Sequence, residues 1–171
     1  LADDFAGQRK FGLEKATNKW VLFIDADERV NKKLKDEIEK EITAPNNPYL
    51  GYFFKRHDYF FGKRLNYGET ARVSLLRLAR KSAGKWVRSV HEIWDVRGRT
   101  KVLRNSILHY PHPTLKEFIK DINFQSDLHA LANQKEDKNS NLARIVFWPK
   151  GKFLYNYLFK LGFLDGTEGF V

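Results

Sequence analysis

Trp20-Val21-Leu22-Phe23-Ile24-Asp25-Ala26-Asp27-Glu28-Arg29 is the stretch that decides the fold, because five apolar residues run directly into three carboxylates. A continuous apolar run of this length predicts a strand buried on both faces, as in a parallel α/β sheet. Carboxylates at the carboxyl end of such a strand lie where open α/β sheets bind their ligands. The stretch therefore predicts a ligand site, and the alternative is a solvated acidic turn that caps the next helix.

The spacing of Asp25 and Asp27 favours a cation as the ligand. Residues two apart on an extended backbone point the same way, and a local turn could bring both carboxylates to one ion. Mg²⁺ and Mn²⁺ prefer oxygen ligands and are held by one or two carboxylates together with substrate phosphates. A divalent cation at this turn is the chemistry that the two residues predict.

The composition of the chain limits the number of domains and the classes of partner that can be expected. The 171 residues are 42% hydrophobic and 15% aromatic, which is enough for one core and favours a single domain. The chain has no cysteine, so disulfides and Cys-ligated zinc are excluded. The net charge of +10 favours anionic partners, namely nucleic acid, acidic lipid headgroups or phosphorylated substrates. No methionine occurs, even at position 1, and no signal peptide is visible, so we expect a piece of a longer protein.

Hydrophobic periodicity predicts helices on either side of the central stretch and strands after it. Helices are expected over 5–17, over 32–42 with Asn31 as N-cap, and over 114–133. The strand-like runs are 51–61, 73–79, 86–96 and 101–110. A helix that leads through a two-residue turn into a buried strand is half of a βαβ unit, so the opening strand is expected upstream of the chain.

Three further groups are candidate site residues. Glu92 lies in the apolar run 89–94, where burial would raise a carboxyl pKa and suit a general base, and the alternative is a salt bridge to one of the many arginines. His109 ends a strand and is either a metal ligand or a satisfied structural residue. Gln8 and Arg9 lie near a helix start, where anions bind well, and surface charge is the alternative.

The last thirty residues combine aromatic side chains with lysines. A break is expected at Pro149-Lys150-Gly151, which would leave a pair of helices. No apolar run approaches the roughly 18 residues that span a bilayer. The composition favours helices that lie in the headgroup region of an anionic membrane. Packing on the domain or on a partner protein are the alternatives.

Six strings in this order resemble the family-2 glycosyltransferases, most nearly the bacterial lipopolysaccharide core glucosyltransferase type. They are "FAGQRKFGLEKATNKWVLFIDADERV", "GYFFKRHDYFFGK", "VSLLRLARK", "VHE", "SILHYP" and "LGFLDGTEGF". The resemblance implies an α/β fold of the glycosyltransferase A type (Rossmann-like) that lacks its first βα units. It also implies a mixed or antiparallel second half and carboxy-terminal amphipathic helices. The expected domains are a partial catalytic domain over 1–113 and a helical, membrane-interfacial region over 114–171.

The resemblance also implies roles for the candidate residues. Asp25 and Asp27 match the Asp-x-Asp motif, in which Asp27 would hold Mg²⁺ or Mn²⁺ against the diphosphate and Asp25 would contact the ribose or sugar or share the metal. Glu92 is placed like the base of inverting members, and His109 like the histidine that completes the metal or diphosphate site. Gln8 and Arg9 match the helix start that lines the nucleotide pocket.

The implied function is inverting, metal-dependent transfer of a sugar, expected to be a hexose, from a nucleotide-diphosphate sugar. The implied acceptor is a cell-envelope glycan or lipid-linked molecule such as lipopolysaccharide core, at the cytoplasmic face of the plasma membrane. The alternatives are a transferase that acts on a polyprenyl-phosphate carrier, a basic nucleic-acid-binding module, and a non-catalytic membrane-bound fragment. Because the first strand of the family is missing, we expect the fragment alone to bind nucleotide sugar poorly.

Overall fold

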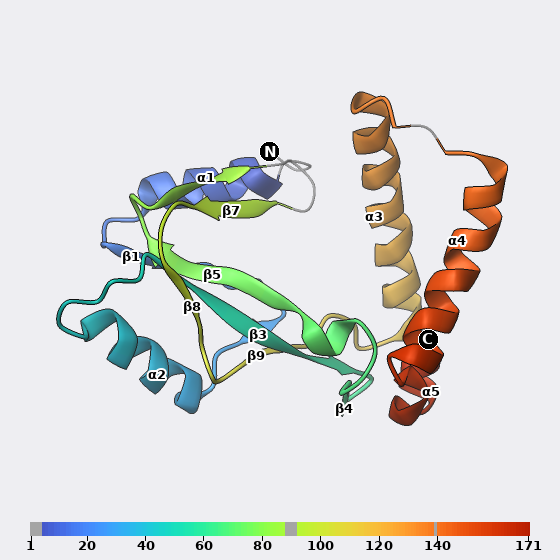
Figure 1. Ribbon diagram of the computed structural model, residues 1–171, viewed down its shortest axis with the longest axis horizontal. Helices are drawn as coiled ribbons and strands as arrows, with labels where there is room; N and C mark the ends of the chain where they lie inside the picture. The colour runs from blue at the N-terminus through green and yellow to red at the C-terminus, as the bar shows by residue number, and fades with distance from the viewer. Residues whose placement is uncertain (1–4, 88–91, 139) are drawn as a thin grey trace. The chain divides into compact units, whose positions relative to one another are not determined.

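The computed structural model describes residues 5–87, 92–138 and 140–171, which form two compact units (Figure 1). The first unit comprises Leu1–Arg56 and Ser74–His109, and the second comprises His57–Val73 and Tyr110–Val171. The second unit thus combines an internal loop with the carboxy-terminal helices. The predicted division at residue 113 into a catalytic domain and an interfacial region stays a prediction.

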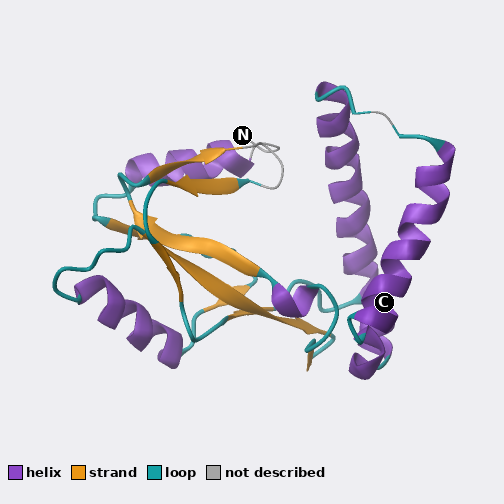
Figure 2. Cartoon of the chain, viewed as in Figure 1, coloured by secondary structure: helices purple, strands orange, loops and turns teal. Residues whose placement is uncertain are grey.

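The first unit contains two helices and most of the described strands (Figure 2). In chain order they are α1 (Phe5–Lys15), β1 (Trp20–Leu22), β2 (Glu28–Arg29), α2 (Lys32–Thr43), β3 (Gly51–Phe60), β5 (Ser74–Arg80), β6 (Gly84–Val87), β7 (Ile93–Val96), β8 (Thr100–Val102) and β9 (Ile107–His109). The end of β3, from His57 on, belongs to the second unit. Both predicted helices are confirmed. The side chain of Asn31 accepts a hydrogen bond from Leu34 N at 2.9 Å, as expected of an N-cap.

The strands form a curled mixed sheet in the order β1-β5-β3-β9-β2, with β8 also paired to β3. The pairs β1–β5, β3–β5 and β2–β9 are antiparallel, whereas β3 and β8 are parallel. A separate antiparallel pair is formed by β6 and β7. The predicted α/β class with a mixed or antiparallel second half is therefore confirmed at that level.

The central apolar run differs from its prediction in one respect. Its alternate side chains do pack on two different clusters, Trp20 and Ile24 on one and Val21 and Phe23 on the other. The strand is short, however, and it pairs antiparallel with β5 at the end of the sheet order. The prediction of a parallel strand was wrong because an apolar run reports coverage of both faces and carries no information about strand direction.

Two clusters of buried side chains cover the two faces of the sheet. One contains Leu34 and Ile38 of α2, and the other contains Leu13 of α1 with Trp86 and Trp94. Helices α1 and α2 lie on opposite sides of the sheet (Figure 1). Adjacent residues of β5 divide between them, since Leu78 joins the first cluster and Ala79 the second. Phe23 and Ile24, the two residues before the acidic turn, likewise pack on different clusters.

Two of the predicted strand runs are interrupted in the structure. The run 86–96 becomes the β6–β7 pair, in which Trp86 lies opposite Trp94. Residues 88–91, which include His91 of the "VHE" string, lie outside the described residues. The run 101–110 divides into β8 and β9, because Arg104 and Asn105 donate their backbone N–H groups to Glu37 of α2 at 2.8 and 2.9 Å.

The second unit is built from short turns and helices. They are β4 (Lys63–Arg64), a 3₁₀ turn (Thr70–Arg72), α3 (Leu115–Lys135), α4 (Leu142–Leu154), a π-helical turn (Tyr155–Phe159), a 3₁₀ turn (Gly162–Asp165) and α5 (Thr167–Phe170). The predicted long helix corresponds to α3, with Thr114 as its N-cap. In the described part of the chain, no helix combines the length and the apolar character that a membrane crossing requires.

The predicted break at Pro149 was wrong, because α4 continues through this residue to Leu154. A proline removes one backbone N–H bond, and the remaining bonds carry the helix past it. After Leu154 the chain passes into the π-helical turn Tyr155–Phe159, in which Lys160 N donates to Tyr155 O at 2.9 Å, and Leu161 follows with φ 60°. The residues on both sides of Pro149 therefore lie in one helix.

Candidate functional site

Arg9 joins two of the predicted site residues. From α1 its guanidinium donates Nη2 to Asp25 Oδ1 at 2.8 Å and Nε to Glu92 Oε1 at 2.7 Å. The group also stacks 4.9 Å from the ring centroid of Trp86, and its side chain is largely buried. The structure thus brings together Arg9, Asp25 and Glu92, which are up to 83 positions apart in the sequence.

Asp25 receives a second guanidinium on its other oxygen. Arg77 of β5 donates Nη2 to Asp25 Oδ2 at 2.5 Å. Burial by itself would raise the pKa of this carboxyl, but attraction to Arg77 and Arg9 outweighs it and lowers the pKa below the ordinary value. The same attraction by Asp25 overcomes the effect of burial on Arg9 and raises its pKa. Asp25 is therefore held ionised and fixed in orientation.

Arg77 and Glu28 form a buried ion pair under the acidic turn. Arg77 Nη2 lies 2.8 Å from Glu28 Oε1, and the two side chains are 8% and 0% exposed. Glu28 Oε2 also accepts a hydrogen bond from Asp25 N at 3.1 Å, while Glu28 N donates to Asp25 O at 3.0 Å. These contacts close the backbone of the turn. They thereby help to fix the position of the Asp25 carboxylate.

Asp27 points to a different partner. Its Oδ2 lies 3.3 Å from His109 Nε2, and β2 and β9 are paired so that Glu28 stands opposite His109. The structure thus brings Asp27 and His109, two of the predicted metal ligands, into direct contact. Asp25 and Asp27 contact two separate sets of side chains in the same unit, and their binding of one ion stays a prediction.

The donor types decide how well a divalent cation fits. Asp27 and His109 offer a carboxylate and an imidazole, both of which Mn²⁺ and Mg²⁺ sites use or tolerate. Both oxygens of Asp25 contact guanidinium groups, which would repel a nearby cation. Among the described residues, no group of three or more His, Asp or Glu side chains is arranged as a metal centre. Asp27 and His109 fit a cation that substrate phosphates also ligate, and Asp25 fits less well.

The positions of Gln8 and Glu92 by themselves do not assign either residue a role. Gln8 is exposed on α1, one residue before Arg9. Glu92 has the salt bridge to an arginine that was the alternative to a catalytic role. Its role as a base stays a prediction.

Sequence reasoning missed Arg77 and Glu28 as site residues. A signal was present for Arg77, which lies between leucines in the string "SLLRLAR", where an arginine is rarely buried without a partner. Glu28 was recognised only as the third carboxylate of the acidic turn. Its partner is 49 positions away, so no local pattern could identify the pair.

Similar proteins give the chain a family context. It is 30% identical over 170 residues to the lipopolysaccharide core biosynthesis glycosyltransferase LpsC of Rhizobium meliloti, an alignment that covers 98% of this chain and 63% of that protein. It is 27% identical to an uncharacterized glycosyltransferase of Rickettsia prowazekii and 26% identical to one of Rickettsia typhi, with 98% of the chain and 61% of each protein covered. No family model matches the chain.

The chain spans about three fifths of the length of these curated relatives, 63% and 61% in the first two cases. The aligned part includes the acidic turn, α1, β5 and β9, since nearly all of the chain is covered. Over almost its whole length the chain is a homologue of bacterial glycosyltransferases, which confirms the resemblance that its sequence strings carry.

Proposed function

We propose that the protein is an inverting glycosyltransferase that moves a hexose from a nucleotide-diphosphate sugar to a cell-envelope acceptor. One observation carries this proposal: a single guanidinium, that of Arg9, contacts both the Asp-x-Asp residue Asp25 and the candidate base Glu92. Donor binding and proton removal would then be coordinated by one buried group. The proposed fold is of the glycosyltransferase A type, which the mixed α/β architecture supports.

Glu92 is the proposed general base. Arg9 holds its Oε1, and Oε2 accepts the proton of the acceptor hydroxyl. The acceptor oxygen then forms a bond to the anomeric carbon as the bond from that carbon to the diphosphate oxygen breaks. Because attack and departure occur on opposite faces, the anomeric configuration inverts. The nucleoside diphosphate leaves with the electron pair of the broken bond.

The diphosphate of the donor is negatively charged, and a bound cation would neutralise part of that charge. Asp27 and His109 would hold Mg²⁺ or Mn²⁺, which supplies Lewis-acid neutralisation of the charge that develops on the diphosphate. Asp25, oriented by Arg9 and Arg77, would accept a hydrogen bond from a hydroxyl of the ribose or sugar. Gln8, next to Arg9 on α1, is proposed to line the nucleotide pocket.

The name of one relative supports the proposed acceptor class. LpsC is named for lipopolysaccharide core biosynthesis, and we extend that acceptor class to this chain. The alternative acceptor is a polyprenyl-phosphate carrier. In either case the enzyme would act as a peripheral protein at the cytoplasmic face of the plasma membrane.

The proposal is tested by nucleotide-sugar turnover in the full-length protein. We expect Glu92→Gln to lower kcat by at least about a hundredfold, the lower range for a general base, while the Kd for the donor stays unchanged. Asp95→Asn is the matched control, since Asp95 is a half-exposed carboxylate on the neighbouring strand β7. Unchanged turnover in Glu92→Gln would remove Glu92 as the base.

A second pair of variants tests the cation. Asp27→Asn should raise the Mn²⁺ concentration needed for half-maximal turnover, whereas Asp36→Asn, which alters an exposed carboxylate on α2, should not. Equal Mn²⁺ dependence in the two variants would contradict the assignment of Asp27 as a metal ligand. Analysis of the anomeric configuration of the product by NMR tests inversion directly.

A further inference from the structure

Helix α4 and the turn after it present an exposed apolar and basic surface in the second unit. Residues 142–164 contain four cations and no carboxylate. Their exposed large apolar side chains are Leu142, Ile145, Val146, Phe147, Trp148, Phe153, Leu154, Tyr155, Leu158, Phe159, Leu161, Phe163 and Leu164. None of the residues of α4 is buried. Exposed apolar surface of this extent marks an interaction site.

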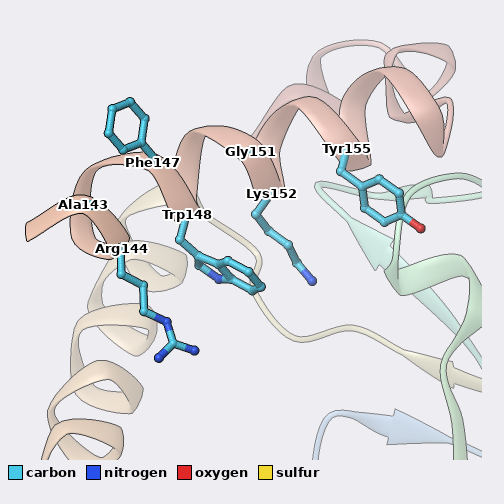
Figure 3. A pocket seen from close by; sticks show the side chains of 7 residues that line it. All are labelled: Ala143, Arg144, Phe147, Trp148, Gly151, Lys152 and Tyr155. Carbon is cyan, nitrogen blue, oxygen red and sulfur yellow. The ribbon is translucent and has the colours of Figure 1, made fainter. Parts of the chain in front are cut away.

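One face of α4 alternates cations with aromatic rings. Arg144, Trp148, Lys152 and Tyr155 are spaced by four, four and three residues, so they project on the same side of the helix, as Figure 3 shows. They line a groove of about 480 Å³, hereafter the α4 groove, together with Ala143, Phe147 and Gly151. A Cβ added at Gly151 would meet nothing within 4 Å, so the groove has open space beside this residue.

From this surface we infer that residues 142–164 dock on a lipid bilayer that contains anionic phospholipids. Arg144 and Lys152 are eight residues apart, about 12 Å along the helix axis, and the exposed apolar side chains of Ile145, Val146, Phe147 and Trp148 lie between them in the sequence. The surface therefore fits a ligand with many phosphates spread over an apolar layer. Trp148, 65% exposed between the two cations, would enter the boundary between headgroups and acyl chains.

The charges favour a bilayer over a second copy of the chain. A two-fold symmetric dimer through the α4 groove would set the same cationic surface against itself. Glu69 contacts Lys152 at 2.6 Å and Lys160 at 4.0 Å, so it partly neutralises these two lysines. Arg144 and Lys150, both exposed, would supply most of the attraction to anionic headgroups. A nucleic acid would satisfy the cations but would leave side chains such as Leu142 and Phe159 in water.

Vesicle co-sedimentation of the full chain tests the inference without any sugar donor, so its outcome is separate from that of the proposed reaction. We expect tight binding to vesicles of phosphatidylcholine with phosphatidylglycerol. Trp148→Ser should weaken it about tenfold, since an aromatic side chain leaves the interface. Phe11→Ser is the matched control, because Phe11 is an exposed aromatic residue on α1 in the first unit.

The contribution of the basic side chains is tested by comparing anionic with neutral vesicles. Arg144→Gln and Lys150→Gln should each weaken binding about fivefold on the anionic vesicles and leave binding to pure phosphatidylcholine vesicles unchanged. Vesicles should also shift the tryptophan emission to the blue, and Trp148→Phe should abolish the shift, because the other three tryptophans lie in the first unit, where Trp86 and Trp94 are buried and Trp20 is partly buried.

Three results would overturn the inference. The first is equal vesicle binding by Trp148→Ser and Phe11→Ser. The second is equal affinity for anionic and neutral vesicles. The third is concentration-dependent self-association that Trp148→Ser abolishes while vesicle binding persists, which would make the second copy of the chain the partner of this surface. Circular dichroism of each variant verifies that the helices are intact.

Discussion

At the scale of single residues, the buried pair Arg77–Glu28 is the least expected feature of the site. Arg77 contacts both Glu28 and Asp25, so one guanidinium fixes the turn and orients its carboxylate. Removing one partner of a buried pair leaves the other charge without compensation, which costs about 3 kcal/mol or more. The mutual attraction of Arg77 and Glu28 adds little net stability, because burying both charges has a cost of its own. The main effect of the pair is to fix the position of Asp25.

Arg77→Gln should accordingly lower the free energy of unfolding by about 3 kcal/mol, measured by chemical denaturation. Arg97→Gln is the control, because the Arg97 side chain is 82% exposed, and it should change the free energy by less than about 0.5 kcal/mol. If both variants were equally stable, the pair would not support the turn.

Asp25 gives the site a dependence on pH. Its folded-state pKa is lowered from the ordinary value of 3.8 by Arg77 and Arg9 against the opposing effect of burial, so the native state binds fewer protons than the unfolded state in that range. The stability that Asp25 contributes is complete above about pH 3.8 and is lost as the pH falls through the lower folded-state value.

The free energy of unfolding should therefore fall less steeply below that pH in Asp25→Asn than in the parent protein. Asp36→Asn, at an exposed position on α2, serves as the reference. Identical acid profiles for Asp25→Asn and the parent protein would show that the two guanidinium groups do not act on Asp25.

At the scale of elements, one buried carboxylate ties the carboxy-terminal turn to the loop after β3. Asp165 Oδ2 accepts hydrogen bonds from Asn66 N at 2.9 Å and Tyr67 N at 2.8 Å, while Lys63 Nζ donates to Asp165 O at 2.5 Å. Both segments belong to the second unit. The string "LGFLDGTEGF" thus has a structural role, which is to hold two distant stretches of chain together.

Asp165→Ala should lower the free energy of unfolding of the second unit by about 3 kcal/mol, because two backbone N–H groups lose a charged acceptor that is itself buried. The measurement is thermal or chemical denaturation followed by circular dichroism. Asp127→Ala, at an exposed position of α3, is the control and should change little. A loss no greater than that of the control would show that the turn is held by its aromatic contacts.

At the scale of the whole molecule, the division into two compact units predicts separate local stabilities. In hydrogen exchange, Asp165→Ala should reduce protection in 57–73 and 110–171, and Arg77→Gln should reduce it in 1–56 and 74–109. The two variants act on different cores, so their effects should not overlap. A uniform loss of protection in either variant would instead mean that the chain unfolds as one cooperative unit.

Much of the architecture could be predicted because it depends on local periodicity. The helical repeat of Leu34 and Ile38, the cap at Asn31 and the β composition of 51–61 all report neighbours a few residues apart. Local periodicity could not predict the antiparallel direction of β1 or the continuation of α4 through Pro149. The first depends on which distant strand supplies the hydrogen bonds, and the second on whether the rest of a helix compensates for one missing bond.

The sequence by itself predicted the candidate site residues as a set of types: two aspartates after an apolar run, a glutamate in a second apolar run, a histidine at a strand end and an arginine on the first helix. It also determined the similarity to glycosyltransferases. Only the tertiary structure decided how these residues are paired, with Arg9 between Asp25 and Glu92, Asp27 against His109, and Arg77 with Glu28 beneath. The physical reason is that ion pairs form between groups brought close by packing, and here the partners are 16 to 83 positions apart.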